Sequence, residues 1–444
     1  MKQQDRRAFL KTSAGFAATL MSGRCWSIQQ PESKETSVVF RPYRPEHTVG
    51  KVSCVTPNDG FYLNSFYDVC PFSPSQRYLA VTRFPFQHRQ PRIGETSDVC
   101  IIDLENRTTE TVYSTKGWGF QLGANLNWGQ TDRYLYTNDI IDGQAVCVRL
   151  DLQIGRAKAF SGPMYHLAPD ESSVVGFPLD LINATQQGYG VPVDWNNIPQ
   201  LKEKVATDQG IWKTDLKTNR KILLMSIADL YAHAKDKDMI GDATFYMFHS
   251  KFNAQGTRIS QVFRGWVIEG GRKRYKPMLF TFDPNGDNVQ LAVRHKLWAP
   301  GGHHPNWHPD GDHILMNLKP DGKHLRFCHF RYDGNAFQVI SEKHPGGGHP
   351  SVTPSGKYLV TDAYVGEDIV PDNKEVPIRL LDTISDEVAV ICHMYTLGRK
   401  DDIGHGTLRL DPHPAWSRDY KKVCFNGAPQ GKRQVFIADL TKVV

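Results

Sequence analysis

The sequence lacks several patterns that define common classes of protein. It has no Cys-x-x-Cys pair, which argues against a zinc site of the finger type. It has no Gly-x-Ser-x-Gly elbow, so nothing supports a serine hydrolase domain. No apolar stretch is long enough to span a bilayer as a stable helix. Helical periodicity is also missing, except around residues 226–236. These absences favour a globular chain built mostly of strands.

Excess charge is nearly absent once the N-terminus is set aside. The 444 residues carry a net charge of +6, and 40% of them are hydrophobic, as in an ordinary globular protein. Residues 1–27 hold five basic side chains and one acidic one, so the remainder carries only +2. A nearly neutral chain gives no reason to expect nucleic acid as a partner.

The N-terminus has the pattern of an export signal. Residues 1–30 begin with a basic stretch in which Arg6 and Arg7 precede Ala-Phe-Leu-Lys, and a short, weakly apolar run follows. This pattern is typical of a twin-arginine signal peptide, whose cargo is exported already folded. A disordered basic tail is the alternative. We therefore expect a periplasmic or secreted protein with no membrane span.

Cysteines are few and odd in number beyond this signal. Seven remain, and five of them lie in apolar, strand-like runs, which predicts buried free thiols. A disulfide between Cys54 and Cys70 stays open at this point.

A turn followed by a strand recurs along the rest of the chain. Each unit continues into a second strand that ends in an acidic turn. The seven first halves span 72–83, 127–139, 167–177, 252–264, 306–318, 351–364 and 415–427. Seven such units predict an all-β, seven-bladed β-propeller over residues 36–444. We expect the extended stretch near 36–46 to complete the last blade and close the ring.

Four histidines occupy one register of this repeat. Each lies seven residues before the turn of its unit: His249, His304, His349 and His413. The other three units carry Val69, Asn125 and Met164 there. The histidines should therefore meet at one rim of the central channel. Six residues past each turn, polar side chains should reach the same face: Asn138, Asn317, Asp362 and Asn426, with Arg264 two places further in its unit.

Two interpretations of the histidines are open. Imidazoles from neighbouring blades can surround one divalent ion, with a carboxylate or water completing the shell. Alternatively, each histidine hydrogen-bonds the backbone of the adjacent blade and serves only to hold the ring together.

Several segments resemble the seven-bladed propeller polysaccharide lyases, which include oligogalacturonate lyases and ulvan lyases. The similar segments are GWGFQLGANLNWG (117–129), TQQGYGVP (185–192), GGGHPSVTPSG (346–356) and RLDPHPAWSRD (409–419). The resemblance implies β-elimination on an acidic oligo- or polysaccharide, assisted by a divalent metal ion such as Mn, Zn or Ca. It also implies that the four histidines hold this metal.

The resemblance further suggests residues for catalysis. Tyr189 resembles the tyrosine of the ulvan-lyase type, whereas Gln121 stands where that type has a neutralising histidine. The metal-dependent type fits better, with Arg264 and Arg409 as contacts to the substrate carboxylate. Each has a structural alternative: a loop aromatic for Tyr189, backbone hydrogen bonding for Gln121, and ion pairing for the arginines, with Asp411 as partner of Arg409.

Fold alone does not decide the function. The sequence supports a secreted polysaccharide lyase acting on uronate-containing oligosaccharides. The alternative is a non-catalytic propeller of the cell envelope that binds glycan or protein.

Overall fold

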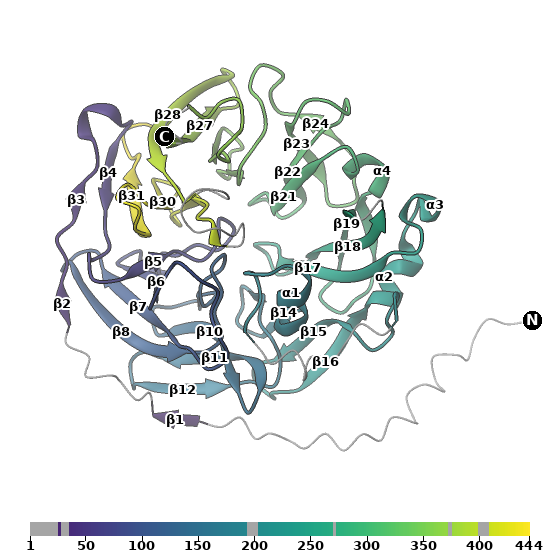
Figure 1. The fold of residues 1–444 in the computed structure, drawn as a ribbon, viewed down its shortest axis with the longest axis horizontal. Coiled ribbons are helices and arrows are strands. Elements are labelled where there is room, and N and C mark those ends of the chain that lie inside the picture. Colours follow the sequence, from purple (N-terminus) through teal and green to yellow (C-terminus); the bar gives the residue numbers. More distant parts are fainter. Residues whose placement is uncertain (1–24, 28–34, 193–202, 270–271, 372–374, 398–407) are drawn as a thin grey trace, which may run out of the picture.

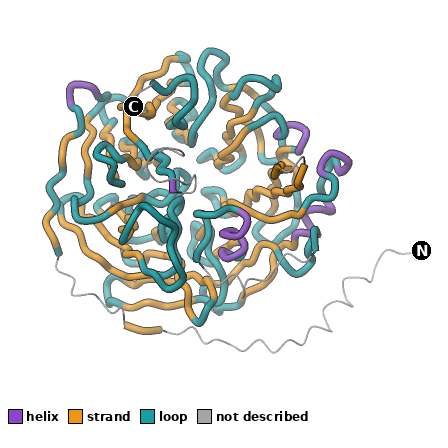
Figure 2. Tube along the Cα trace, in the orientation of Figure 1, coloured by secondary structure: helices purple, strands orange, loops and turns teal. Residues whose placement is uncertain are grey.

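The computed structural model describes residues 25–27, 35–192, 203–269, 272–371, 375–397 and 408–444. These residues form seven antiparallel sheets, arranged as blades around a central axis (Figure 1). The predicted seven-bladed β-propeller is therefore confirmed. Figure 2 shows how little of the ring is helical.

Blades 1 to 3 come from the first half of the chain. Blade 1 contains β5 (Phe61–Leu63), β6 (Tyr78–Phe84), β7 (Ser97–Asp103), β8 (Thr108–Thr115) and β2 (Thr36–Ser37). Blade 2 contains β9 (Asn127–Trp128), β10 (Tyr134–Ile141), β11 (Gln144–Asp151), β12 (Arg156–Ala159) and β1 (Cys25–Ser27). Blade 3 contains β13 (His166–Leu167), β14 (Ser173–Gly176), β15 (Gly210–Asp215) and β16 (Lys221–Ser226).

Blades 4 to 7 complete the circle. Blade 4 contains β17 (Thr244–Phe252), β18 (Ile259–Glu269), β19 (Arg272–Phe282) and β20 (Gln290–Val293). Blade 5 contains β21 (Gly302–Trp307), β22 (His313–Leu318), β23 (Arg326–Arg331) and β24 (Gln338–Val339). Blade 6 contains β25 (Ser351–Val352), β26 (Tyr358–Thr361), β27 (Glu375–Asp382) and β28 (Glu387–Tyr395). Blade 7 contains β29 (Ala415–Trp416), β30 (Lys422–Gly427), β31 (Gln434–Asp439), β4 (Lys51–Cys54) and β3 (Arg41–Pro42).

The N-terminal part of the propeller closes the ring. β4 pairs with β31, the last strand of the chain, and β3 lies outside β4. Of the stretch 36–46, which was expected to complete the last blade, only β3 lies in blade 7. The strand that pairs with β31 is β4, which comes slightly later in the chain. β2 pairs with β8 of blade 1 instead. Residues 25–27, within the expected signal segment, pair with β12, and residues 1–24 lie outside the described residues.

Apolar side chains fill the space between blades, because one face of each strand packs on the neighbouring sheet. In blade 4, Phe245, Phe263 and Phe280 are fully buried on adjacent strands, and the first two rings stack at 4.8 Å between centroids. Burying such a side chain contributes roughly 1.5–3 kcal/mol. Packing of this kind makes the ring a rigid support for residues at its channel.

Helices are short and lie in the connections. They are α1 (Leu179–Thr185), α2 (Ile227–His233), α3 (Lys237–Ile240), α4 (His295–Trp298) and the 3₁₀ turn η2 (Pro45–His47). α2 falls in the one segment where the sequence has helical periodicity. Within the described ranges, no helix has both the length and the apolar character needed to cross a membrane. The described cysteines from Cys54 to Cys424 are free thiols, so Cys54 and Cys70 are not bridged.

Candidate metal centre and its surroundings

The histidines lie in the innermost strands or two residues before them, on an unusual backbone. β17 and β21 each contain a β-bulge, at His249 and His304, and both residues have left-handed backbone, with φ of 56° and 59°. His413 has φ of 49°, whereas in blade 6 Gly348, just before His349, takes this conformation. A non-glycine residue in this region is uncommon, and bulges change the direction in which a side chain points. The bulges thus aim the imidazoles of His249 and His304 away from the regular strand faces.

Phe66, from the segment after β5, lies among the four predicted histidines. Its ring centroid is 4.4 Å from that of His413, 5.3 Å from His249, 5.6 Å from His349 and 6.4 Å from His304. The repeat register therefore brings the four histidines together, as expected. An apolar ring stands at the centre of the group.

Two of the four histidines join a carboxylate to form a possible metal site. His349, Asp411 and His413 are buried, and one ligand atom from each lies within 4.8 Å of the others. Among the described residues, neither ring nitrogen of His413 has a hydrogen-bond partner. Its Nε2 lies 3.8 Å from Oδ2 of Asp411. Two imidazoles and one carboxylate are donors that suit Mn²⁺ or Zn²⁺, and the partnerless nitrogens fit a ligand role.

Asp362 holds His349 and His413 in place through hydrogen bonds. Its carboxylate accepts a hydrogen bond from Nδ1 of His349 at 2.9 Å, and also from the backbone N–H groups of His349 at 2.7 Å and His413 at 3.1 Å. Because Nδ1 of His349 donates to the carboxylate, its Nε2 keeps a free lone pair. Such carboxylate–histidine pairs orient metal ligands in many proteins. The sequence correctly placed Asp362 at this face.

His304 and Tyr364 lie beside the group. Nδ1 of His304 donates to the carbonyl of Gly348 at 2.7 Å, which leaves Nε2 as the acceptor. The hydroxyl of Tyr364 lies 3.2 Å from Nε2 of His304 and 3.3 Å from Nε2 of His349. Burial raises the pKa of Tyr364 well above its ordinary value. Tyr364 therefore keeps its proton and can donate it to either imidazole.

Burial also keeps three imidazoles uncharged. Loss of solvent is the main cause that lowers the pKa of His249, His304 and His413 well below the ordinary value. A neutral imidazole is the form that binds a metal ion. His249 lies outside the candidate metal group, since its Nδ1 contacts the hydroxyl of Tyr165 and its ring stacks on Phe66.

Three of the four predicted catalytic residues contact one another. The guanidinium of Arg409 donates through Nε to Asp411 at 2.7 Å and through Nη2 to the hydroxyl of Tyr189 at 3.0 Å. The side-chain amide of Gln121 donates to the carbonyl of Arg409 at 3.0 Å. Burial opposes the charge of Arg409, but Asp411 and Tyr189 outweigh it and raise its pKa. Arg409 thus stays cationic, next to the candidate metal group.

Arg264, the fourth predicted catalytic residue, lies beside this cluster. Its Nη1 donates to the side-chain carbonyl of Gln186 at 3.3 Å, and its guanidinium lies 5.6 Å from the ring centroid of Phe248. Phe248 in turn packs edge-on against Tyr189 at 5.0 Å. Phe248 therefore contacts both Arg264 and Tyr189.

Sequence reasoning missed three members of the site. Asp411 was considered only as an ion-pair partner of Arg409, although its place two residues before His413 was a usable signal for a ligand pair. Phe66 lies in an irregular segment that no repeat position identifies. Tyr364 stands eight residues past the turn of its unit, the register of Arg264, and this shared register was a usable signal. Tyr364, Arg409 and Asp411 together line a cavity of 170 Å³ next to the group.

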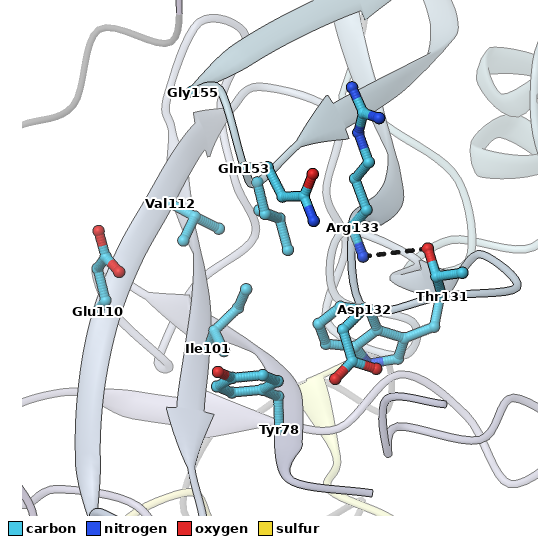
Figure 3. Close-up of a pocket in the computed structure, with 11 residues that line it drawn as sticks. Tyr78, Ile101, Glu110, Val112, Thr131, Asp132, Arg133, Gln153 and Gly155 are labelled. Atoms are coloured by element: carbon cyan, nitrogen blue, oxygen red, sulfur yellow. Dashed lines mark hydrogen bonds between the residues drawn. The ribbon is translucent and has the colours of Figure 1, made fainter. Parts of the chain in front are cut away.

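A larger groove lies elsewhere, between blades 1 and 2 (Figure 3). It has a volume of 440 Å³ and apolar walls that include Ile101 and Val112. The guanidinium of Arg133 at its edge is paired with Asp151 at 2.7 Å. The groove shares no residue with the histidine group, so the site chemistry does not involve it.

Comparison with solved structures shows which proteins share this fold. An oligogalacturonate lyase in complex with manganese superposes with a TM-score of 0.66 at 14% identity, covering 92% of this chain and 98% of that one. An oligogalacturonate lyase from Vibrio parahaemolyticus gives a TM-score of 0.64 at the same identity and the same coverage. The chain thus has the seven-bladed propeller fold of oligogalacturonate lyases. No protein-family model and no curated protein matches the sequence.

Proposed function

We propose that this protein is a polysaccharide lyase that cleaves uronate-containing oligosaccharides by β-elimination. The observation that carries the proposal is the buried group of His349, Asp411 and His413, with Arg409 and Tyr189 beside it. The shared fold with oligogalacturonate lyases supports it.

Different residues would bind the cation and the acidic sugar. His349, Asp411 and His413 would hold a divalent ion, which when bound would help to neutralise the substrate carboxylate. Arg409 is a buried cation at the edge of the same cavity, so it can hold the uronate through charge-assisted hydrogen bonds. Asp362 and Gln121 keep His349 and the backbone of Arg409 in place.

The chemical step needs a proton acceptor and a proton donor. The C–H bond next to the carboxylate breaks, its electron pair forms the double bond, and the bond to the 4-oxygen breaks as that oxygen is protonated. We assign removal of the C–H proton to Tyr189, which would act as a phenolate with Arg409 as its counter-charge, and protonation of the 4-oxygen to Tyr364, which keeps its proton. Neutralising the carboxylate makes the adjacent proton easier to remove.

The test combines metal analysis with product detection. Purified protein should contain one equivalent of a divalent ion and release unsaturated, ultraviolet-absorbing product from oligogalacturonate or another uronate-containing glycan. Arg409→Lys should lower kcat/KM about 100-fold while the metal content stays unchanged, because a single ammonium cannot replace the forked contact. His324→Asn, at an exposed site, is the control. Absence of product from every uronate glycan, with Mn²⁺, Zn²⁺ or Ca²⁺ added, would contradict the proposal.

We also propose export by the twin-arginine route, on the basis of the Arg6-Arg7 segment. Replacing both arginines by lysine should leave the protein in the cytoplasm, as measured by cell fractionation. Unchanged export of this variant would exclude the route.

A further inference from the structure

The other end of the central channel contains a second cavity. It has a volume of 220 Å³ and is lined by the far ends of the inner strands, including Trp307 and Trp416, and by Tyr67. Tyr67 separates the cavity from the histidines, since its ring centroid lies 5.2 Å from that of His349 and 5.6 Å from that of His304. The two ends of the channel are therefore distinct sites that share one wall.

A buried ion pair forms part of this cavity. Nζ of Lys251 lies 2.5 Å from Oδ2 of Asp68, and both side chains are at most 3% exposed. The same ammonium donates to the carbonyl of Pro305 at 2.7 Å and lies 5.0 Å from the ring centroid of Tyr67. Lys251 thus occupies the place that a cationic ligand would take beside the carboxylate and the ring. Because Asp68 neutralises Lys251, the ammonium also contributes little to the binding of an anionic ligand.

Two residues that line the cavity each carry a buried oxygen that lacks a partner. Oδ1 of Asp68 and Oγ of Ser351 are buried and have no hydrogen-bond partner among the described residues. Buried oxygens of this kind are normally paired, and Oδ1 of an ionised carboxylate can only accept. A ligand that satisfies them must bring hydroxyl or N–H donors. The indole rings of Trp307 and Trp416 offer apolar surfaces beside these oxygens.

The geometry points to a binding site for a neutral, hydroxyl-rich molecule the size of one monosaccharide. The cavity volume of 220 Å³ has room for one sugar ring. Sugar hydroxyls would donate to Asp68 and Ser351, and the C–H face of the ring would pack on an indole. This site is additional to the proposed lyase site and does not depend on it.

Binding can be measured on the full chain by saturation-transfer NMR and calorimetry. The probes are D-glucose, D-galactose, D-mannose, L-rhamnose and myo-inositol, with D-galacturonate and tetramethylammonium as charged counterparts. At least one neutral probe should bind, and the charged ones should bind at least tenfold more weakly at this site. Failure of all the neutral probes, or stronger binding of tetramethylammonium, would overturn the inference.

Variants locate the binding. Ala254 is exposed and lines the cavity, so Ala254→Trp should block it and abolish binding without affecting the fold. Ser351→Ala should weaken binding several-fold, whereas Ser385→Trp, on an exposed turn of blade 6, should leave it unchanged. Sugar binding that survives Ala254→Trp would disprove the location. His349→Ala, which removes a proposed metal ligand, should bind the neutral sugar normally, so the two proposals can fail separately.

Discussion

Blades 2 and 7 use the same backbone feature in different ways. Asn125 and His413 occupy one register of the repeat, both are buried, and both have left-handed backbone, with φ of 54° and 49°. The amide of Asn125 donates to the carbonyls of Met164 and Tyr165 in the next blade. The ring nitrogens of His413 have no partner among the described residues. The position is thus a structural link between blades in one case and a source of free ligand atoms in the other.

His304 both links two blades and directs a ring nitrogen toward the site. Its Nδ1 bonds the carbonyl of Gly348 in the next blade, as Asn125 does, while its Nε2 faces Tyr364. An imidazole can do this because its two nitrogens point in different directions. The structural and the functional interpretation of the repeated histidines are therefore compatible at a single residue.

The largest expected effect comes from giving blade 7 the asparagine that blade 2 has at this register. His413→Asn should fold but lose the bound divalent ion, and lyase activity should fall on the order of a thousandfold, because the substrate carboxylate loses its main counter-charge. Metal analysis and the rate of unsaturated product formation measure this. A variant with normal metal content and activity would show that His413 has only a structural role.

A smaller effect should follow from changing the support behind the ligands. Asp362→Asn removes the charge that orients His349 but keeps a side chain of the same shape. Metal affinity should fall about 10- to 100-fold, the usual range for such supporting residues. Titration with a competing chelator gives the affinity, and Asn426→Asp, at the same register in blade 7, tests whether the effect is local.

The smallest effect concerns stability in acid. In the metal-free protein, burial holds the pKa of His249 below the value of about 6.5 that it has when unfolded. Below pH 6.5 the unfolded chain therefore binds a proton that the folded chain does not, so stability falls as the pH is lowered. His249→Asn should make this fall shallower by about 1.4 kcal/mol per pH unit.

Urea unfolding between pH 7.5 and 5.5 measures that slope. Well above pH 6.5, where the imidazole of His249 is neutral in both states, the two proteins should show the same pH dependence. Equal slopes below pH 6.5 would mean that His249 becomes protonated in the folded protein.

Periodicity explains how much could be predicted from the sequence. The turn-and-strand repeat gives the blades and the shared position of His249, His304, His349 and His413, since equivalent repeat positions become equivalent positions in space. The same periodicity cannot identify Phe66, which lies in a segment between strands. Tyr364 shares the register of Arg264, eight residues past the turn, so its position could be predicted but its contacts with two imidazoles could not. Asp411 was overlooked as a ligand because pairing with Arg409, which does occur, already accounted for its charge.

The closure of the ring has a consequence for the order of assembly. β4, near the start of the propeller, pairs with β31, which comes far later in the sequence, at Gln434–Asp439 against Lys51–Cys54. These two strands share a sheet with β29, which directly follows His413. β3 can pair with one edge of β4 early, but during synthesis the other edge must wait until β31 has left the ribosome. The blade that carries Asp411 and His413 is therefore completed last, and a truncated chain cannot form the site.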